Sequence, residues 1–207
     1  MKTIRIFSLM LATCGAAILP TYSSNAEDFD RRGGIAWEEI ERLVAQGAVK
    51  ESALLSHDTS DPYKDLPEEG AVLVGFEFIM TPFKKSPRTV RGIRAIFLTR
   101  HGEIKGAQHG AEVGKPTDMN VVARPGYAVG KVTGQFDGVA IRRLRIHFQR
   151  IDGVKLDAND AYDSSWFGIY DRNLTTEATI ETRDHVPVGI AGRSGWGLDG
   201  MKLVFVE

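Results

Sequence analysis

Near the end of the chain, a glycine-rich segment combines residue types that can hold a sugar. The segment GRSGWGLDG places Gly195, Trp196, Gly197 and Asp199 within five residues, between two apolar runs. Backbone N–H groups and one carboxylate can meet adjacent sugar hydroxyls in a fixed geometry. An aromatic ring offers a flat apolar face to the C–H side of a sugar, and glycines let the backbone approach closely. The segment indicates a sugar pocket. The alternative is a tight turn in which Asp199 caps the loop and Trp196 packs inward.

The residue types of hydrolases and metal sites are present, but not in the required spacing. The histidines show no HxH, HExxH or i,i+4 pairing. The serine of GRSGWG lacks both the G-x-S-x-G spacing and the strand-to-helix context of a nucleophile elbow. We therefore expect no enzyme activity, no metal ion and no cofactor. The five histidines are His57, His101, His109, His147 and His185.

An acidic segment, DANDAYD, resembles the start of a calcium-binding loop. Asp157 and Asn159 fit the first two ligand positions of an EF-hand, but Ala161 fails the third and Gly168 stands at position twelve. The segment is more typical of a turn held by Asx hydrogen bonds.

Four arginines cluster on one expected strand and its ends. They could bind an anion, or they could solvate the exposed face of that strand and protect its edge. The sequence leaves both interpretations open. The cluster comprises Arg142, Arg143, Arg145 and Arg150.

The elements that must position these residues are short strands. From residue 71 to 207, runs rich in Val, Ile and Phe are separated by Gly, Pro, Asp and Asn. In LRIHFQRI, Leu144, Ile146 and Phe148 alternate with polar residues, which is typical of a strand with one buried face. Such runs, at roughly 8–20-residue spacing, predict an all-β sandwich, barrel or prism. The expected strands are 71–80, 92–99, 119–123, 127–136, 140–151, 176–182, 186–192 and 200–207.

The N-terminal part of the chain predicts export. A basic start, an apolar run over 6–19 and small residues at Ser24 and Ala26 are typical of a signal peptide, 1–26, cleaved near Ala26. The apolar run is shorter than the ~20 residues of a membrane span, so we expect no span in the mature form. Cys14 leaves a lipoprotein anchor open. We expect a secreted or periplasmic protein.

Residues 27–70 predict a helix followed by a linker. Apolar residues recur at helical spacing over 34–47, and residues 56–70 are dense in Asp, Pro and Ser.

A formal net charge of −1 gives no field that would attract nucleic acid or an anionic membrane. We expect three parts: 1–26, 27–70 and an all-β domain over 71–207.

The segment from about Leu73 to Val206 resembles the jacalin-related lectin domain, a β-prism of three small antiparallel sheets. The resemblance is carried by GYAVGKVTGQF, IRRLRIHF and VPVGIAGRSGWGLDGMKLVFV. LPEEGAVLVGFEF and RPGYAVG also resemble stretches of bacterial secreted proteins.

The resemblance implies a sugar site at the G-x-x-x-D pattern of 195–199. It implies that the carboxylate of Asp199 holds sugar hydroxyls and that the backbone amides of Trp196 and Gly197 face the sugar. The loop 135–139, with Asp137 and Val139, would flank the pocket as a secondary contact.

The chain departs from the family pattern in two places. The lectins begin with a strand and a Gly-Gly loop that forms the other wall of the pocket, and no such segment precedes Leu73 in register. The stretch 152–179 is a longer and more acidic insertion.

These observations together predict a secreted, non-catalytic protein that binds a glycan or glycoconjugate. The alternative is a structural or protein-interaction module of the cell envelope without sugar binding. A homo-oligomer is compatible with either function, and no nucleic-acid partner is expected.

Overall fold

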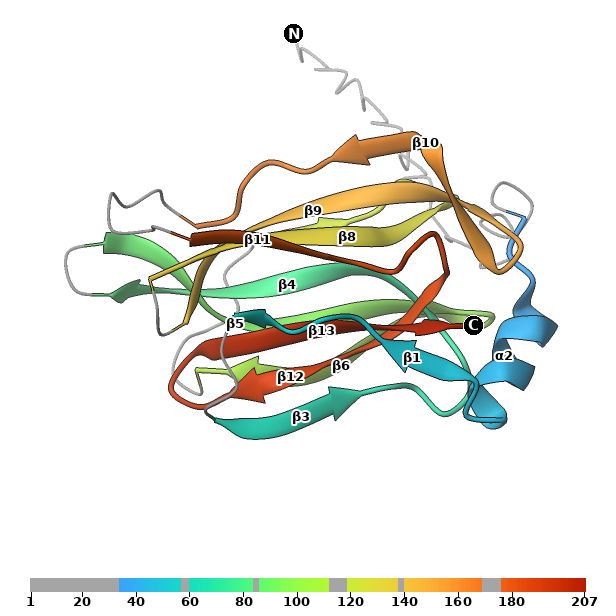
Figure 1. Ribbon diagram of the computed structural model, residues 1–207, viewed down its shortest axis with the longest axis horizontal. Helices are drawn as coiled ribbons and strands as arrows, with labels where there is room; N and C mark the ends of the chain where they lie inside the picture. The colour runs from blue at the N-terminus through green and yellow to red at the C-terminus, as the bar shows by residue number, and fades with distance from the viewer. Residues whose placement is uncertain (1–33, 57–59, 84–85, 112–118, 138–139, 169–175) are drawn as a thin grey trace, which may run out of the picture.

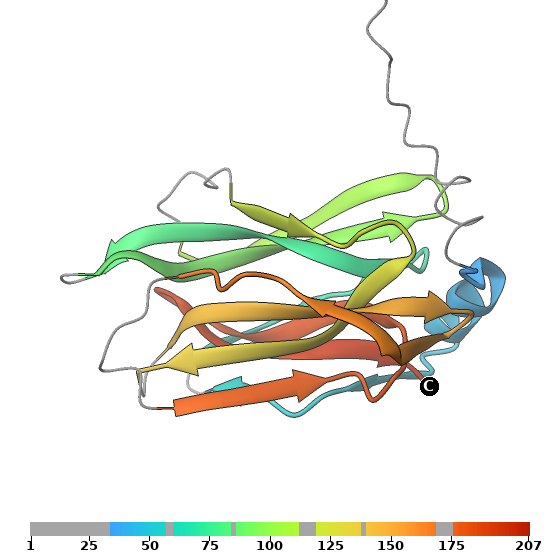
Figure 2. The ribbon, with the colours of Figure 1, turned by 90° about the horizontal axis from the view of Figure 1, so that it is seen from above.

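The chain forms one helix and three antiparallel sheets within the part that the structure describes. The expected all-β fold of three small sheets is confirmed. The strands run along the long axis of the molecule, and the helix α2 lies at one end (Figures 1 and 2). The expected signal peptide, 1–26, lies outside the described residues. The computed structural model describes residues 34–56, 60–83, 86–111, 119–137, 140–168 and 176–207.

The three sheets differ in how far apart their strands lie in the sequence. Sheet I has the order β1-β13-β12-β3, with β2 also paired to β13; sheet II has the order β6-β5-β4-β7, and sheet III the order β10-β9-β8-β11. Sheet I comprises β1 (Val49–Glu51), β2 (Leu55–Ser56), β3 (Asp61–Asp65), β12 (Pro187–Ser194) and β13 (Leu198–Val206). Sheet II comprises β4 (Val72–Phe83), β5 (Ser86–Thr99), β6 (Gly102–Gly110) and β7 (Asn120–Val122). Sheet III comprises β8 (Tyr127–Phe136), β9 (Ile141–Asp152), β10 (Lys155–Asp163) and β11 (Thr176–Glu181).

The inner faces of the three sheets enclose one apolar core. On β9, Leu144, Ile146 and Phe148 are at most 1% exposed, as their alternation predicts. They share the core with Phe97 of sheet II and Leu203 of sheet I. Each large apolar side chain buried in this way stabilises the fold by about 1.5–3 kcal/mol. The core therefore fixes which face of every strand points outward.

The helix α2 (Trp37–Ala45) confirms the helix expected over 34–47. Trp37, Ile40 and Leu43 form its buried face and pack on a second apolar cluster with residues from all three sheets. Gly47, at φ +69°, takes the left-handed conformation in which glycine commonly ends a helix. No helix within the described ranges is long and apolar enough to cross a membrane.

The linker expected over 56–70 is wrong in part, because β3 and the end of β2 lie within it. β3 forms the edge of sheet I and, among the strands in the described ranges, pairs with β12 alone. Proline is tolerated in an edge strand, where its missing N–H interrupts no central ladder, and Pro62 of β3 pairs with Arg193. A strand and not a linker therefore leads into the region of Gly195.

The expected insertion, 152–179, supplies β10 and the start of β11 to sheet III. The register between β10 and β9 shifts between Asp157 and Ala161. At this bulge the N–H of Asn159 donates to Oδ1 of Asp157 at 2.8 Å, which is the expected Asx hydrogen bond, but the segment belongs to strand β10 and is not the expected turn. Residues 169–175 lie outside the described ranges.

Gly192→Ala tests the close packing within sheet I. A Cβ at Gly192 would overlap the backbone oxygen of Gly200 on β13 and would lie 2.7 Å from the hydroxyl of Tyr63. We expect the variant to lose about 1–3 kcal/mol of unfolding free energy, measured by urea denaturation.

The control is Gly195→Ala, whose Cβ would have its nearest neighbour at 3.4 Å. An unchanged denaturation midpoint for Gly192→Ala would contradict the packing described here.

Candidate functional site

The glycine-rich segment forms the turn 195–197 between β12 and β13, at the end of the molecule opposite α2 (Figures 1 and 2). The N–H of Gly195 donates to the carbonyl oxygen of Gly197 at 3.1 Å, which closes the turn. The side chain of Trp196 is 91% exposed. The alternative in which Trp196 packs inward is therefore wrong, and the indole stands in solvent on a hydrogen-bonded turn.

Asp199 follows this turn as the second residue of β13, and its side chain is only 8% exposed. Its carboxylate oxygen Oδ2 accepts a hydrogen bond from the hydroxyl of Ser60. Ser60 immediately precedes β3. The carboxylate therefore faces the neighbouring edge strand beneath the turn, where a buried acceptor needs a donor.

A third segment reaches the turn from β5. The guanidinium of Arg91 donates to the carbonyl oxygen of Trp196. Burial lowers the pKa of Arg91, and the charge of Arg142 lowers it further; the carboxylates of Asp199 and Asp137 act in the opposite direction. The side chain of Arg91 thus ties the turn to sheet II and sets a positive charge beside the carboxylate of Asp199. We call Ser60, Arg91, the turn 195–197 and Asp199 the corner.

Asp137, which was expected to flank the pocket, lies near the corner, where its charge acts on Arg91. The carboxylate of Asp137 accepts a hydrogen bond from Nε of Arg142 at 3.0 Å and another from the N–H of Ala140 at 3.3 Å. The side chain of Ala140 would lie 3.8 Å from a Cβ placed at Gly197. Val139 lies outside the described residues.

The two glycines of the turn are not required by its backbone. Neither Gly195 nor Gly197 has a positive φ. A Cβ at Gly195 would lie 3.4 Å from Oδ2 of Asp199, and a Cβ at Gly197 would lie 3.7 Å from Oδ1. These are ordinary contact distances, so alanine would fit at either position. Each glycine leaves room for about one methyl group beside the carboxylate.

Two residues of the corner were missed by the sequence analysis. Ser60 lies in a segment dense in Asp, Pro and Ser, and it meets Asp199 across 139 residues of sequence. Arg91 meets Trp196 across 105 residues. No spacing or periodicity in a single sequence carries such contacts.

The expected basic cluster is not brought together. Arg142 is buried beside the corner, at 4% exposure. Arg143 and Arg145 lie over the ring of Trp166, with Cζ at 4.5 and 5.0 Å from its centroid. Arg150 instead lies near Tyr127 and Asp160. The four arginines therefore lie in three different places and do not form one anion site.

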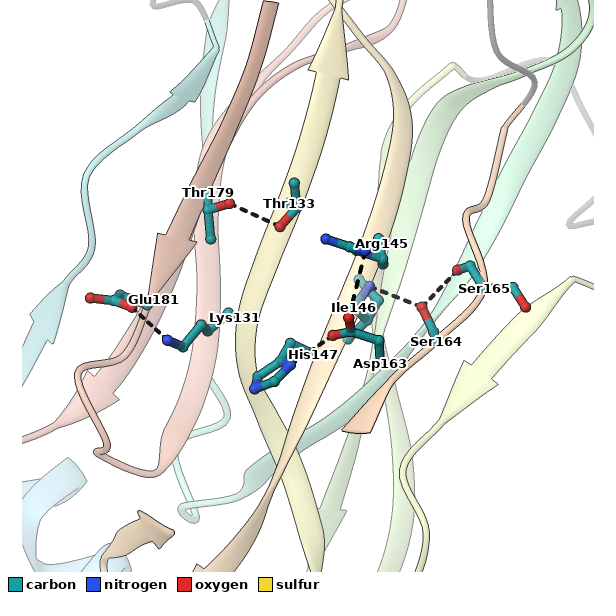
Figure 3. A network of polar contacts seen from close by, with 10 residues as sticks. All are labelled: Lys131, Thr133, Arg145, Ile146, His147, Asp163, Ser164, Ser165, Thr179 and Glu181. Carbon is teal, nitrogen blue, oxygen red and sulfur yellow. Dashed lines mark hydrogen bonds and ion pairs between the residues drawn. The ribbon is translucent and has the colours of Figure 1, made fainter. Parts of the chain in front are cut away.

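Two of the histidines lie beside single carboxylates. Nδ1 of His147 lies 2.7 Å from Oδ1 of Asp163 on the outer face of sheet III, as Figure 3 shows. Nε2 of His109 lies 3.5 Å from the carboxylate of Asp65. His57 lies outside the described residues. Among the residues that the structure describes, no group of three or more His, Cys, Asp or Glu side chains could hold a metal ion.

Comparison with known proteins places the fold. No family model and no curated protein matches the chain, but solved structures do. Frutapin, a lectin from Artocarpus incisa, matches with a TM-score of 0.54 at 14% identity, over 77% of this chain and 97% of that chain. AcmJRL, a mannose binding jacalin related lectin from Ananas comosus, matches with a TM-score of 0.52 at 13% identity, over 77% and 98%. Malaysian banana lectin matches with a TM-score of 0.52 at 13% identity, over 76% of this chain and 98% of that chain. The expected β-prism fold of the jacalin-related lectins is confirmed.

Ser60→Ala tests the support of the buried carboxylate. The variant removes the hydroxyl that donates a hydrogen bond to Oδ2 of the buried Asp199. We expect a loss of about 1–3 kcal/mol of unfolding free energy, measured by urea denaturation.

Ser165→Ala is the matched control, because Ser165 is exposed. Its effect should stay within about 0.5 kcal/mol. Equal midpoints for the two variants would show that the Ser60–Asp199 contact does not support the corner.

Proposed function

We propose that the protein recognises a carbohydrate at the corner without catalysis. The observation that carries this proposal is the pair of glycines, Gly195 and Gly197, that leave space beside the carboxylate of Asp199 although alanine would fit at both. A turn selected only for its conformation has no need of two glycines at these φ values. Space beside a carboxylate is what a ligand hydroxyl requires.

The chemistry of the corner suits a sugar. A carboxylate accepts hydrogen bonds from hydroxyl groups with both of its oxygens. Oδ2 of Asp199 already accepts from Ser60, so a sugar hydroxyl would bind at Oδ1 beside Gly197. The exposed indole of Trp196 would cover the apolar C–H face of the ring. Arg91 would hold the turn in place by its bond to the Trp196 carbonyl, so binding would require little ordering of the backbone.

The comparisons support this proposal at the level of fold. The solved structures that share the β-prism are lectins, and AcmJRL is described as mannose binding. Because a fold does not determine its ligand, the corner has to carry the argument. Mannose oligosaccharides are the first probes to use. We also propose that the chain acts outside the cytoplasm, on the grounds of the expected signal peptide.

Protein recognition by the outer face of sheet III is a second candidate. It is favoured by Trp166, whose ring lies beneath the guanidinium groups of Arg143 and Arg145. Aromatic and arginine side chains are enriched in protein interfaces. The test is a pull-down from the native host. A protein partner that stays bound in excess free sugar, but does not bind the Trp166→Ala variant, would favour this function over glycan binding.

Gly197→Ala tests the proposed site without removing a polar group. The added methyl fills the space beside Oδ1 of Asp199, so affinity for the glycan selected on an array should fall at least tenfold. Because alanine fits here, the unfolding free energy should stay within about 1 kcal/mol of the wild type. Calorimetric titration and urea denaturation give the two values.

Asp199→Asn and the control Ser165→Ala complete the test. The amide keeps the shape of the carboxylate but loses its charge and one acceptor, and we expect binding to be abolished with an unchanged far-UV CD spectrum. The control should bind like the wild type. Equal affinity of Gly197→Ala and wild type would reject the corner, and a wild type that binds no glycan would reject the function.

A further inference from the structure

The outer face of sheet I carries a groove that is separate from the corner. Its volume is about 570 Å³, within the range of ligand sites. One wall is β3, with Pro62 and Lys64; the other is the segment 51–54, which begins at the last residue of β1. Ala191 belongs to the floor. None of Ser60, Arg91, Asp199 and the turn 195–197 lines this groove.

The strand register places two lysines on either side of the groove floor. Ala191 of β12 pairs with Lys64 of β3 and with Lys202 of β13. Lys202 lies between Met201 and Leu203, which belong to the core, so its side chain points outward. The methyl group of Ala191 lies between the two lysine positions and is itself buried, at 6% exposure.

One carboxylate joins these lysines. Oε1 of Glu51 lies 3.3 Å from Nζ of Lys64, and Oε2 lies 3.0 Å from Nζ of Lys202. The hydrogen bond from Lys202 is the main cause that lowers the pKa of Glu51, against the opposing effect of burial. Arg193 also lines the groove. Two lysines thus share one carboxylate, and each ammonium has three N–H donors, of which Glu51 takes one.

We propose that this groove binds an anionic saccharide, a sugar unit that carries a carboxylate or a sulfate. The anionic group binds Lys64 and Lys202 and competes with Glu51 for them. The rest of the sugar lies in the groove between β3 and the segment 51–54, with Pro62 as an apolar neighbour. This site extends the protein's ligands beyond the neutral sugar proposed for the corner, and it does not depend on the corner.

Binding is tested by calorimetric titration of the full chain with three probes. These are an oligogalacturonide, which carries carboxylates, a heparin-derived oligosaccharide, which carries sulfates, and a neutral mannose oligosaccharide. The wild type should bind at least one of the two anionic probes. The neutral probe should not bind in the groove, so its affinity should be unaffected by changes there. The two anionic probes distinguish a carboxylate from a sulfate ligand.

The double variant Lys64→Met/Lys202→Met removes both charges and keeps the apolar stems. This variant should bind the anionic probe with an affinity at least tenfold lower than that of the wild type. Lys131→Met is the matched control, because Lys131 is also a strand lysine paired with one carboxylate, that of Glu181 at 3.1 Å, but on sheet III. It should bind within twofold of the wild type.

Glu51→Gln gives a test of opposite sign. Because Glu51 competes with the ligand for the lysines, the Glu51→Gln variant should bind the anionic probe several-fold more tightly than the wild type. A damaged fold would not raise the affinity. Asp199→Asn should leave this affinity unchanged, so failure at the corner and failure at the groove are distinguishable. The proposal is overturned if the wild type binds neither anionic probe, if the double variant binds like the wild type, or if Glu51→Gln fails to bind more tightly.

Discussion

The burial of one face of each of three sheets against a common core is the constraint on which the rest of the structure depends. Leu144, Phe97 and Leu203 come from three different sheets and share that core. Once their faces point inward, the intervening residues must point outward and the turns must gather at the ends of the molecule. The corner and the groove both follow from this arrangement, since β12 and β13 contribute to each.

The corner differs from an open pocket because its carboxylate is already engaged. Ser60, immediately before β3, bonds to Asp199, and Arg91 of β5 bonds to the turn, so two other segments hold the geometry that a ligand would use. Such support reduces the ordering that binding requires. It also means that Asp199 has a structural partner, and substitutions that keep an acceptor for Ser60, such as Gly197→Ala and Asp199→Asn, separate binding from folding.

The sequence predicted those elements whose own residues carry a pattern. The alternation in β9 and the apolar runs of β4 and β13 reflect burial of the strand itself, so one sequence suffices. β3 and β6 are edge strands with few buried residues, and little in their composition distinguishes them from loops. For the site, the turn 195–197 and Asp199 were predicted from residue types, whereas Ser60 and Arg91 depend on long-range contacts that no local pattern encodes.

The three tryptophans allow the central claim to be measured directly. Trp37 is on the buried face of α2, Trp166 lies on sheet III and Trp196 lies in the turn of the corner. In a ¹H–¹⁵N spectrum each indole gives its own N–H signal. On titration with a glycan that the protein binds, such as a mannose oligosaccharide, the indole signal of Trp196 and the amide signals of Gly195 and Gly197 should shift together, while those of Trp37 and Trp166 stay in place. Saturation with the glycan without a shift at Trp196 would contradict recognition at the corner.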